Sequence, residues 1–251
     1  MKKTWIVFGL MAVILAGGWI TYNSKGGPAI PFDALTHGLM ALIAWYVYVR
    51  IKESYAETGN LAHRYLSYFM LGWVIAGLSV AIGNFYFFDV PALFGLGFII
   101  ALIALFPASA YLVRIPFLIK NAPVLEKLAF RLILAVGVLI ILFNVFYWPG
   151  SYVNEQGFTV YNSNFPIPFF GLLAFTAYGA VAALLSLFFF YGFATEKEKV
   201  PRIRSLFFAL GTLFSVGLGL HLAGAGALSS WGELGVAVGF LFVLLGVLYK
   251  D

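Results

Sequence analysis

Two histidines and two asparagines are the side chains of this sequence best suited by type and position to binding a ligand. His37 and His221 can bind a metal or exchange a proton, and Asn84 and Asn144 can donate and accept hydrogen bonds. All four lie within long apolar segments, where polar side chains are costly and point to function. The pattern predicts a small-ligand site formed by His37, Asn84, Asn144 and His221. Asp33 precedes His37 by one helical turn and would accept a hydrogen bond from its ring.

The same two histidines also fit a second chemistry. Imidazoles are axial ligands of b-type haem, so His37 and His221 would supply both ligands, with Met40 as an alternative ligand. Gly217 and Gly224 share a helical face with His221 and would let a planar molecule, or another helix, approach the backbone. The sequence therefore leaves open a ligand-binding protein that needs no cofactor and an electron-transfer subunit that carries haem b.

Recognisable catalytic and ion-relay residues are missing from the sequence. There is no cysteine, no HExxH, no GxSxG and no aspartate-rich motif for magnesium. The middle of each apolar segment contains no Asp, Glu, Lys or Arg, which disfavours a proton pump, an ion-coupled carrier and a voltage sensor. Arginines at the segment ends, including Arg114 and Arg204, are expected to extend toward the membrane surface. We therefore expect a non-enzymatic protein without catalytic residues or a metal site.

The amino-acid composition indicates whether these segments fold in water or in a membrane. Of the 251 residues, 63% are hydrophobic and 10% are charged, whereas an average globular chain has about 25% charged residues. So few polar side chains cannot cover a surface in water, which predicts an integral membrane protein in contact with the lipid bilayer. The formal net charge of +5 would otherwise suggest nucleic acid as a partner, but this composition excludes that class.

The apolar segments are predicted to form an all-α transmembrane bundle, a single domain over residues 1–251. About 20 apolar residues cross a bilayer as a helix, and continuous rather than alternating runs favour helices over a barrel. Gly235 and Gly239 predict a helix-packing face on the last span. Eight spans are predicted, at about 4–22, 34–52, 64–87, 92–115, 129–148, 167–193, 204–226 and 233–249.

Basic residues give the predicted bundle its orientation. With both termini in the cytoplasm, fourteen of the fifteen Lys and Arg residues fall on the cytoplasmic side, and Lys25 lies outside. We expect a multi-pass protein of the inner (cytoplasmic) membrane, with the four ligand-site candidates in one layer near the outer surface. The external loop over 149–166 would be a lid or an ordered surface loop. Cleavage of the first span as a signal peptide is an alternative that leaves seven spans.

Two stretches resemble a known family. One contains Tyr46-Val-Tyr48-Val-Arg50, then Arg64-Tyr65, Phe69 and Trp73; the other contains Arg202-Ile-Arg204, Leu206, Leu210-Gly211 and Gly217-Leu-Gly219 before the last span. This pattern is similar to the seven-helix N-terminal membrane sensor region of histidine kinases, over residues 34–249. The resemblance implies a ligand-sensing bundle that passes a signal inward through its last helix. Because the chain has no kinase domain, we expect a sensor or accessory subunit that acts through partner proteins.

Overall fold

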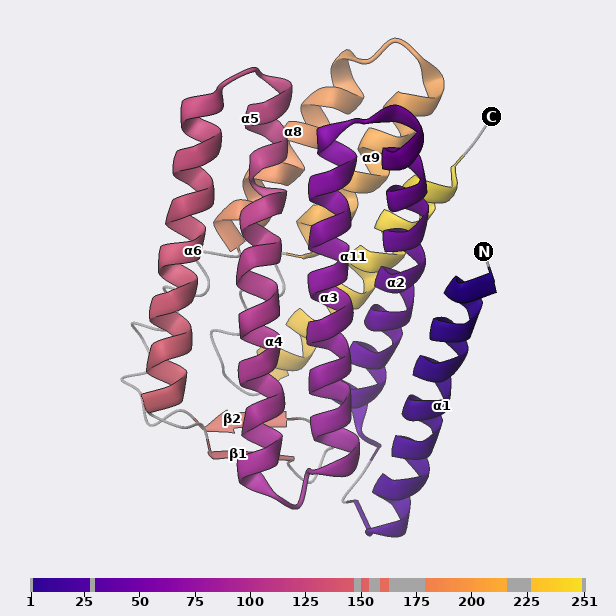
Figure 1. The fold of residues 1–251 in the computed structure, drawn as a ribbon, viewed down its shortest axis with the longest axis vertical. Coiled ribbons are helices and arrows are strands. Elements are labelled where there is room, and N and C mark those ends of the chain that lie inside the picture. The colour runs from indigo at the N-terminus through magenta and orange to yellow at the C-terminus, as the bar shows by residue number, and fades with distance from the viewer. Residues whose placement is uncertain are drawn as a thin grey trace.

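The computed structural model describes residues 2–27, 30–146, 150–153, 159–162, 179–215 and 227–249. Within these ranges the protein is a bundle of helices with one β-hairpin (Figure 1). The helices are α1 (Lys2–Ser24), α2 (Phe32–Thr58), α3 (Leu61–Tyr86), α4 (Pro91–Leu112), α5 (Arg114–Ile119), α6 (Pro123–Phe146), α8 (Val181–Thr195), α9 (Lys199–Phe214) and α11 (Ala227–Leu248). Strands β1 (Gly150–Val153) and β2 (Thr159–Asn162) pair antiparallel in the predicted external loop.

Five helical segments are long and apolar enough to cross a membrane. They coincide with the first five predicted spans, which confirms the helical class and these apolar segments: Thr4–Ser24, Phe32–Thr58, Leu61–Tyr86, Pro91–Ile119 and Pro123–Phe146. Two further apolar helical segments, Val181–Thr195 and Leu234–Leu248, are shorter. The predicted sixth and seventh spans include 167–178 and 216–226, which lie outside the described residues, so the total of eight spans stays a prediction.

Helix ends differ from the predicted span ends where capping residues decide them. α2 continues to Thr58, beyond the predicted end at 52, and stops at Gly59, whose φ of 65° is the left-handed conformation that glycine adopts without strain. The side chain of Asn60 then accepts a hydrogen bond from the N–H of Ala62 at 2.9 Å and begins α3. α6 begins at Pro123 rather than 129. Hydropathy detects the apolar part of a helix, whereas its polar ends are set by caps.

The helix connections gather at two ends of the bundle (Figure 1). The "termini end", named for the end of α11 that lies toward it, contains the α2–α3, α5–α6 and α8–α9 turns. The "hairpin end" contains the α1–α2 connection, the α3–α4 turn and the β-hairpin. Lys25 lies at the hairpin end. The remaining basic residues between 30 and 249 lie at the termini end: Arg50, Lys52, Arg64, Arg114, Lys120, Lys127, Arg131, Lys197, Lys199, Arg202 and Arg204. The asymmetry that the orientation prediction needs is therefore present in the fold.

The helices α2, α3 and α4 form the centre of the bundle through contacts at glycines. A Cβ at Gly77 of α3 would lie 2.7 Å from the main-chain oxygen of His37, and a Cβ at Gly72 would overlap the Cβ of Ala108 on α4. Close backbone packing of this kind holds helices together in a bilayer, because lipid tails are as apolar as the protein interior. α1 packs against α3 and α2, and α6 packs against α4 and α5.

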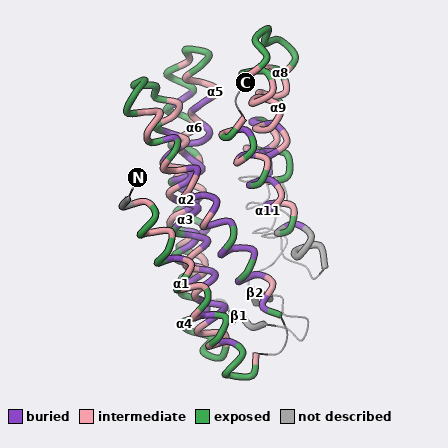
Figure 2. The backbone as a smooth tube through the Cα atoms, turned by 90° about the vertical axis from the view of Figure 1, so that its right-hand side faces the viewer, coloured by how far each residue is buried: buried purple, intermediate pink, exposed green. Residues whose placement is uncertain are grey.

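The last helix, α11, connects the C-terminal helices to the centre of the bundle (Figure 2). A Cβ at Gly239 would lie 2.6 Å from the main-chain oxygen of Gly211 on α9, which confirms the predicted packing face. On α11, the ring of Phe240 meets Trp73 of α3 edge-on, with 4.8 Å between ring centroids. α11 also packs along α2, so it contacts both α2 and α9.

Candidate functional site

His37 lies near the start of α2, on a stretch of backbone that neighbouring helices enclose. Its Nδ1 is 2.9 Å from the main-chain oxygen of Asp33, so the predicted contact with Asp33 is present, through the main chain. A Cβ at Gly38 would lie 2.8 Å from Leu15 of α1, and α3 touches the backbone of His37 at Gly77. The His37 side chain is 7% exposed. The fold therefore fixes the position of this imidazole.

Four buried polar side chains lie on α2 and α3 in the parts of these helices near the hairpin end. This "α2–α3 polar cluster" consists of Asp33, Thr36, His37 and Asn84. In a helix, the Cα–Cβ bonds tilt toward the N-terminus of that helix. The N-terminus of α2 is at the hairpin end and that of the antiparallel α3 is at the other end, so the side chains of α2 and of Asn84 tilt in opposite directions along the bundle. These tilts bring the side chains of the two helices toward the same height along the bundle. Asn84 Nδ2 donates to the main-chain oxygen of Val80 at 3.0 Å.

The other predicted site residues do not join this cluster in the part of the chain that the structure describes. Asn144 lies near the end of α6, where its Nδ2 donates to the oxygen of Ile140 at 2.8 Å. Figure 1 shows α3 and α4 between α6 and α2. Met40 is 1% exposed and packs in the apolar core. His221 falls within 216–226, outside the described residues.

One feature of the structure bears on the alternative prediction of haem b, the position of the His37 ring. The contact from His37 Nδ1 to a carbonyl oxygen is of the kind that orients a metal-binding histidine. Among the described residues, no group of three or more His, Asp or Glu side chains is arranged to hold a metal ion. The second predicted haem ligand, His221, lies outside those residues. Haem b therefore stays a prediction that rests on His37.

The structure adds a buried ion pair at the termini end that sequence motifs did not reveal. Arg114 of α5 donates to Glu126 Oε1 of α6 from Nε at 2.7 Å and from Nη2 at 2.6 Å. The Tyr65 hydroxyl of α3 donates to the same oxygen at 3.1 Å. The guanidinium lies 4.3 Å from the ring centroid of Tyr65 and 5.1 Å from that of Phe130. Arg114 thus joins three helices, in contrast to the expectation that it extends toward the membrane surface.

A weak sequence signal for this ion pair exists in retrospect. Arg114 and Glu126 are equally distant along the chain from Lys120, where α5 ends and the chain turns through Asn121 at a φ of 50°. Residues equally distant from a turn face one another when two helices pack antiparallel. Nothing in the sequence pointed to Tyr65 as the third member.

A cavity of about 60 Å³ lies between α3, α4, α8, α9 and α11. Its walls are mostly apolar and include the rings of Phe69, Phe189, Phe208 and Phe240. No charged side chain lines it in the described part of the chain. Its polar side chains are Trp73, Ser109, Thr212 and Ser215. Two of these bond to their own helix, Thr212 to Phe208 O at 2.8 Å and Ser215 to Gly211 O at 2.8 Å.

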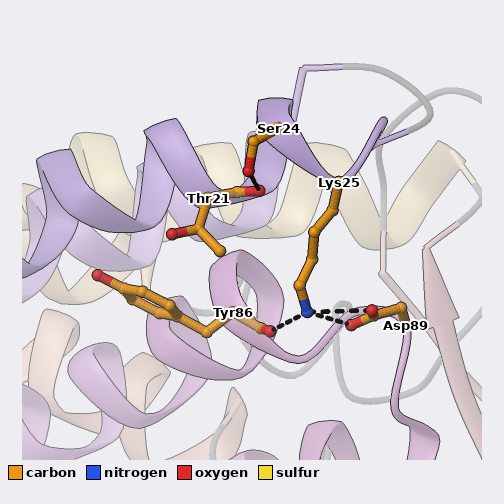
Figure 3. A network of polar contacts seen from close by, with 5 residues as sticks. All are labelled: Thr21, Ser24, Lys25, Tyr86 and Asp89. Carbon is orange, nitrogen blue, oxygen red and sulfur yellow. Dashed lines mark hydrogen bonds and ion pairs between the residues drawn. The ribbon is translucent and has the colours of Figure 1, made fainter.

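An ion pair at the hairpin end ties the segment after α1 to the α3–α4 turn (Figure 3). Lys25 Nζ lies 2.9 Å and 3.0 Å from the two carboxylate oxygens of Asp89, and 3.0 Å from the main-chain oxygen of Tyr86. The hydrogen bond from Lys25 lowers the pKa of Asp89. Both side chains are more than one third exposed, so salt screens the pair.

The Lys25–Asp89 pair predicts a small loss of stability in acid. Because the folded-state pKa of Asp89 is lowered, its stabilisation is present above the unfolded value of about 3.9 and disappears as the pH falls through the folded value. We expect the unfolding temperature of the wild type to fall more than that of Asp89→Asn between neutral pH and about pH 3. Thermal melts of both proteins at matched ionic strength measure this, and parallel pH profiles would contradict it.

These features differ in the chemistry that they can perform. In each of the ion pairs Arg114–Glu126 and Lys25–Asp89, the two side chains neutralise one another's charge and hold two segments of the chain together. The α2–α3 polar cluster combines a carboxylate, a hydroxyl, an imidazole and an amide, which are the groups that recognise a polar ligand.

Compared with known proteins, the chain matches no family model, no curated protein sequence and no solved structure.

Proposed function

We propose that the protein is a membrane sensor or accessory subunit that binds a small polar ligand and acts through partner proteins. The observation that carries this proposal is the α2–α3 polar cluster, in which Asp33, His37 and Asn84 are 2%, 7% and 2% exposed. Polar side chains buried among membrane-spanning helices are costly, and they commonly mark binding sites. A carboxylate, an imidazole and an amide together offer donors and acceptors, which suits a small amine or amide.

The proposed binding site faces the outside of the cytoplasmic membrane. In support, the termini end carries eleven of the basic residues between 30 and 249, and loops rich in Lys and Arg stay in the cytoplasm. The hairpin end, toward which the cluster lies, would then face outward. This orientation goes with the proposed total of eight spans and with both termini in the cytoplasm.

A route from the proposed site to the opposite side of the membrane exists in the packing. α2 carries His37 and packs along α11, and α11 runs to the termini end. There Arg204 of α9 donates to the main-chain oxygen of Tyr249 from Nη2 at 3.0 Å and from Nε at 3.2 Å. A shift of α2 on ligand binding would therefore move α11 and α9. This agrees with the inward signalling through the last helix that the histidine kinase resemblance implies.

A thermal-shift screen of the purified protein tests the proposal. Small amines, amino acids and amides are added to the wild type, to His37→Ala and to Asn84→Ala. Ser79→Ala is the matched control, because Ser79 lies on α3 outside the cluster and bonds its own helix, at Ile75 O, at 2.7 Å. We expect a compound that stabilises the wild type and the control and binds each cluster variant about tenfold more weakly, the usual effect of losing a buried hydrogen bond.

Two results would contradict the proposal. One is that no compound of these classes stabilises the wild type, and the other is that a stabilising compound acts equally on both cluster variants. A visible absorption spectrum of the same wild-type sample distinguishes the alternative function. A haem band that disappears in His37→Ala would favour the electron-transfer subunit with His37 and His221 as ligands.

A further inference from the structure

We propose that the cavity between α3–α4 and α8–α9–α11 binds a hydrocarbon chain taken up from the bilayer. Five helices contribute to its wall, and it has about 60 Å³ of space. It is separate from the α2–α3 polar cluster, since no residue belongs to both. This proposal therefore stands or fails independently of the proposed function.

Water is a poor occupant of this cavity. The space is several times the ~10–15 Å³ that one water needs, but a buried water also needs about two to four polar partners. The hydroxyls of Thr212 and Ser215 already donate within α9 and its C-terminal turn. Trp73 and Ser109 are the other polar side chains that line the cavity. They are too few to hold water throughout the space, so an apolar molecule is the better occupant of most of it.

The depth of the cavity points to hydrocarbon as that molecule. Trp73 lies at the middle of α3, and the contact between Gly72 and Ala108 places Ser109 of α4 at the same level. In a bundle whose long helices cross a bilayer, the middle of a helix lies in the hydrocarbon core. The surrounding solvent at this level is therefore lipid chains.

Among the described residues, α8 separates the cavity from the surroundings on one side. Ala182 and Leu185 of α8 line the cavity and are 8% and 1% exposed, whereas Leu184 and Leu187 are 63% and 66% exposed. The two pairs lie on different faces of the same helix. A hydrocarbon chain that passes beside α8 would move from the lipid phase into the cavity, which is also apolar and is lined by aromatic rings.

The cavity also contains groups that could select a chain with an oxygen atom. Ser109 lines the cavity and is 5% exposed. Trp73, which also lines it, has a buried Nε1 without a hydrogen-bond partner within the described residues. A hydroxyl or carbonyl on the bound chain would satisfy a group of this kind. A long-chain alcohol should therefore compete better than an alkane of equal length.

Photolabelling of the full-length protein in phosphatidylcholine vesicles tests the proposal. One sample contains a phosphatidylcholine with a diazirine on its acyl chain, and a second contains a long-chain alcohol with the same group. We expect adducts on Phe69, Phe189 or Phe208 that excess unlabelled chain removes. Adducts on the exposed Leu184 should fall only in proportion to dilution. Cavity labelling by the phospholipid identifies an acyl chain, and labelling by the alcohol identifies a free amphiphile; either result supports the proposal.

Two neighbouring variants of α8 provide the decisive comparison. Ala182→Phe places a ring in the space that the bound chain would occupy, so it should reduce labelling of the cavity residues about tenfold, which corresponds to about 1.4 kcal/mol of binding free energy. Ala183→Phe, which adds the same ring at a position that does not line the cavity, should label like the wild type. If Ala182→Phe does not fold, competition in the wild type still decides. Absent or non-saturable cavity labelling with both probes, or full labelling in a folded Ala182→Phe, would overturn the proposal.

Discussion

Replacing Glu126 with alanine should lower the free energy of unfolding by about 3–5 kcal/mol, because it leaves a buried positive charge without its partner. The side chains of Arg114 and Glu126 are 21% and 10% exposed, so solvent screens the pair little. The same change removes the acceptor of the Tyr65 hydroxyl and loosens the contact between α3, α5 and α6. Equilibrium unfolding in mixed micelles, followed by tryptophan fluorescence, measures the loss.

Two variants separate the effect of the unpaired charge from other effects of the substitution. Glu57→Ala removes an exposed carboxylate at the end of α2 and should change stability by less than about 0.5 kcal/mol. The double variant Arg114→Met/Glu126→Leu removes both charges and should recover most of the loss, since apolar residues often replace a buried ion pair without cost. Equal stability of Glu126→Ala and Glu57→Ala would show that the pair contributes nothing.

The ion pair also shows which part of the fold the sequence could predict. Each apolar run is a property of one segment, and the first five predicted spans therefore match long helices. The environment of Arg114 depends on which segments meet. Hydropathy placed it at a span end, where contact with the membrane surface was the simplest outcome. The structure instead places Glu126 and Tyr65 from two other helices beside it.

The position of each candidate residue along its helix follows from the sequence, but its position around the bundle does not. At about 1.5 Å per residue, position along a span predicts one layer for His37, Asn84, Asn144 and His221. Their direction around the bundle depends on the order in which helices pack. α2 and α3 are adjacent, so His37 and Asn84 belong to neighbouring helices, whereas α6 packs on α4. The apolar cavity requires the same three-dimensional information, since its walls come from five separate helices.

Alanine at two glycines should change stability in opposite directions, although both glycines lie within apolar helices. At Gly72, a Cβ would overlap the Cβ of Ala108 and lie 2.9 Å from the main-chain oxygen of Ala104. The backbone of α4 must move to make room, so Gly72→Ala should destabilise the protein by about 1–3 kcal/mol, the usual cost of overpacking. At Gly9 of α1, a Cβ would have no neighbour within 4 Å.

Gly9→Ala should therefore stabilise the protein by up to about 1 kcal/mol, because alanine favours a helix more than glycine does. Unfolding of both variants in the same mixed micelles measures the two changes, and the single added methyl group makes them a matched pair. A loss of stability at both positions, or at neither, would show that the close contact between α3 and α4 does not determine the outcome. Opposite signs would support direct backbone packing at Gly72, the contact that brings Trp73 and Ser109 to one level beside the cavity.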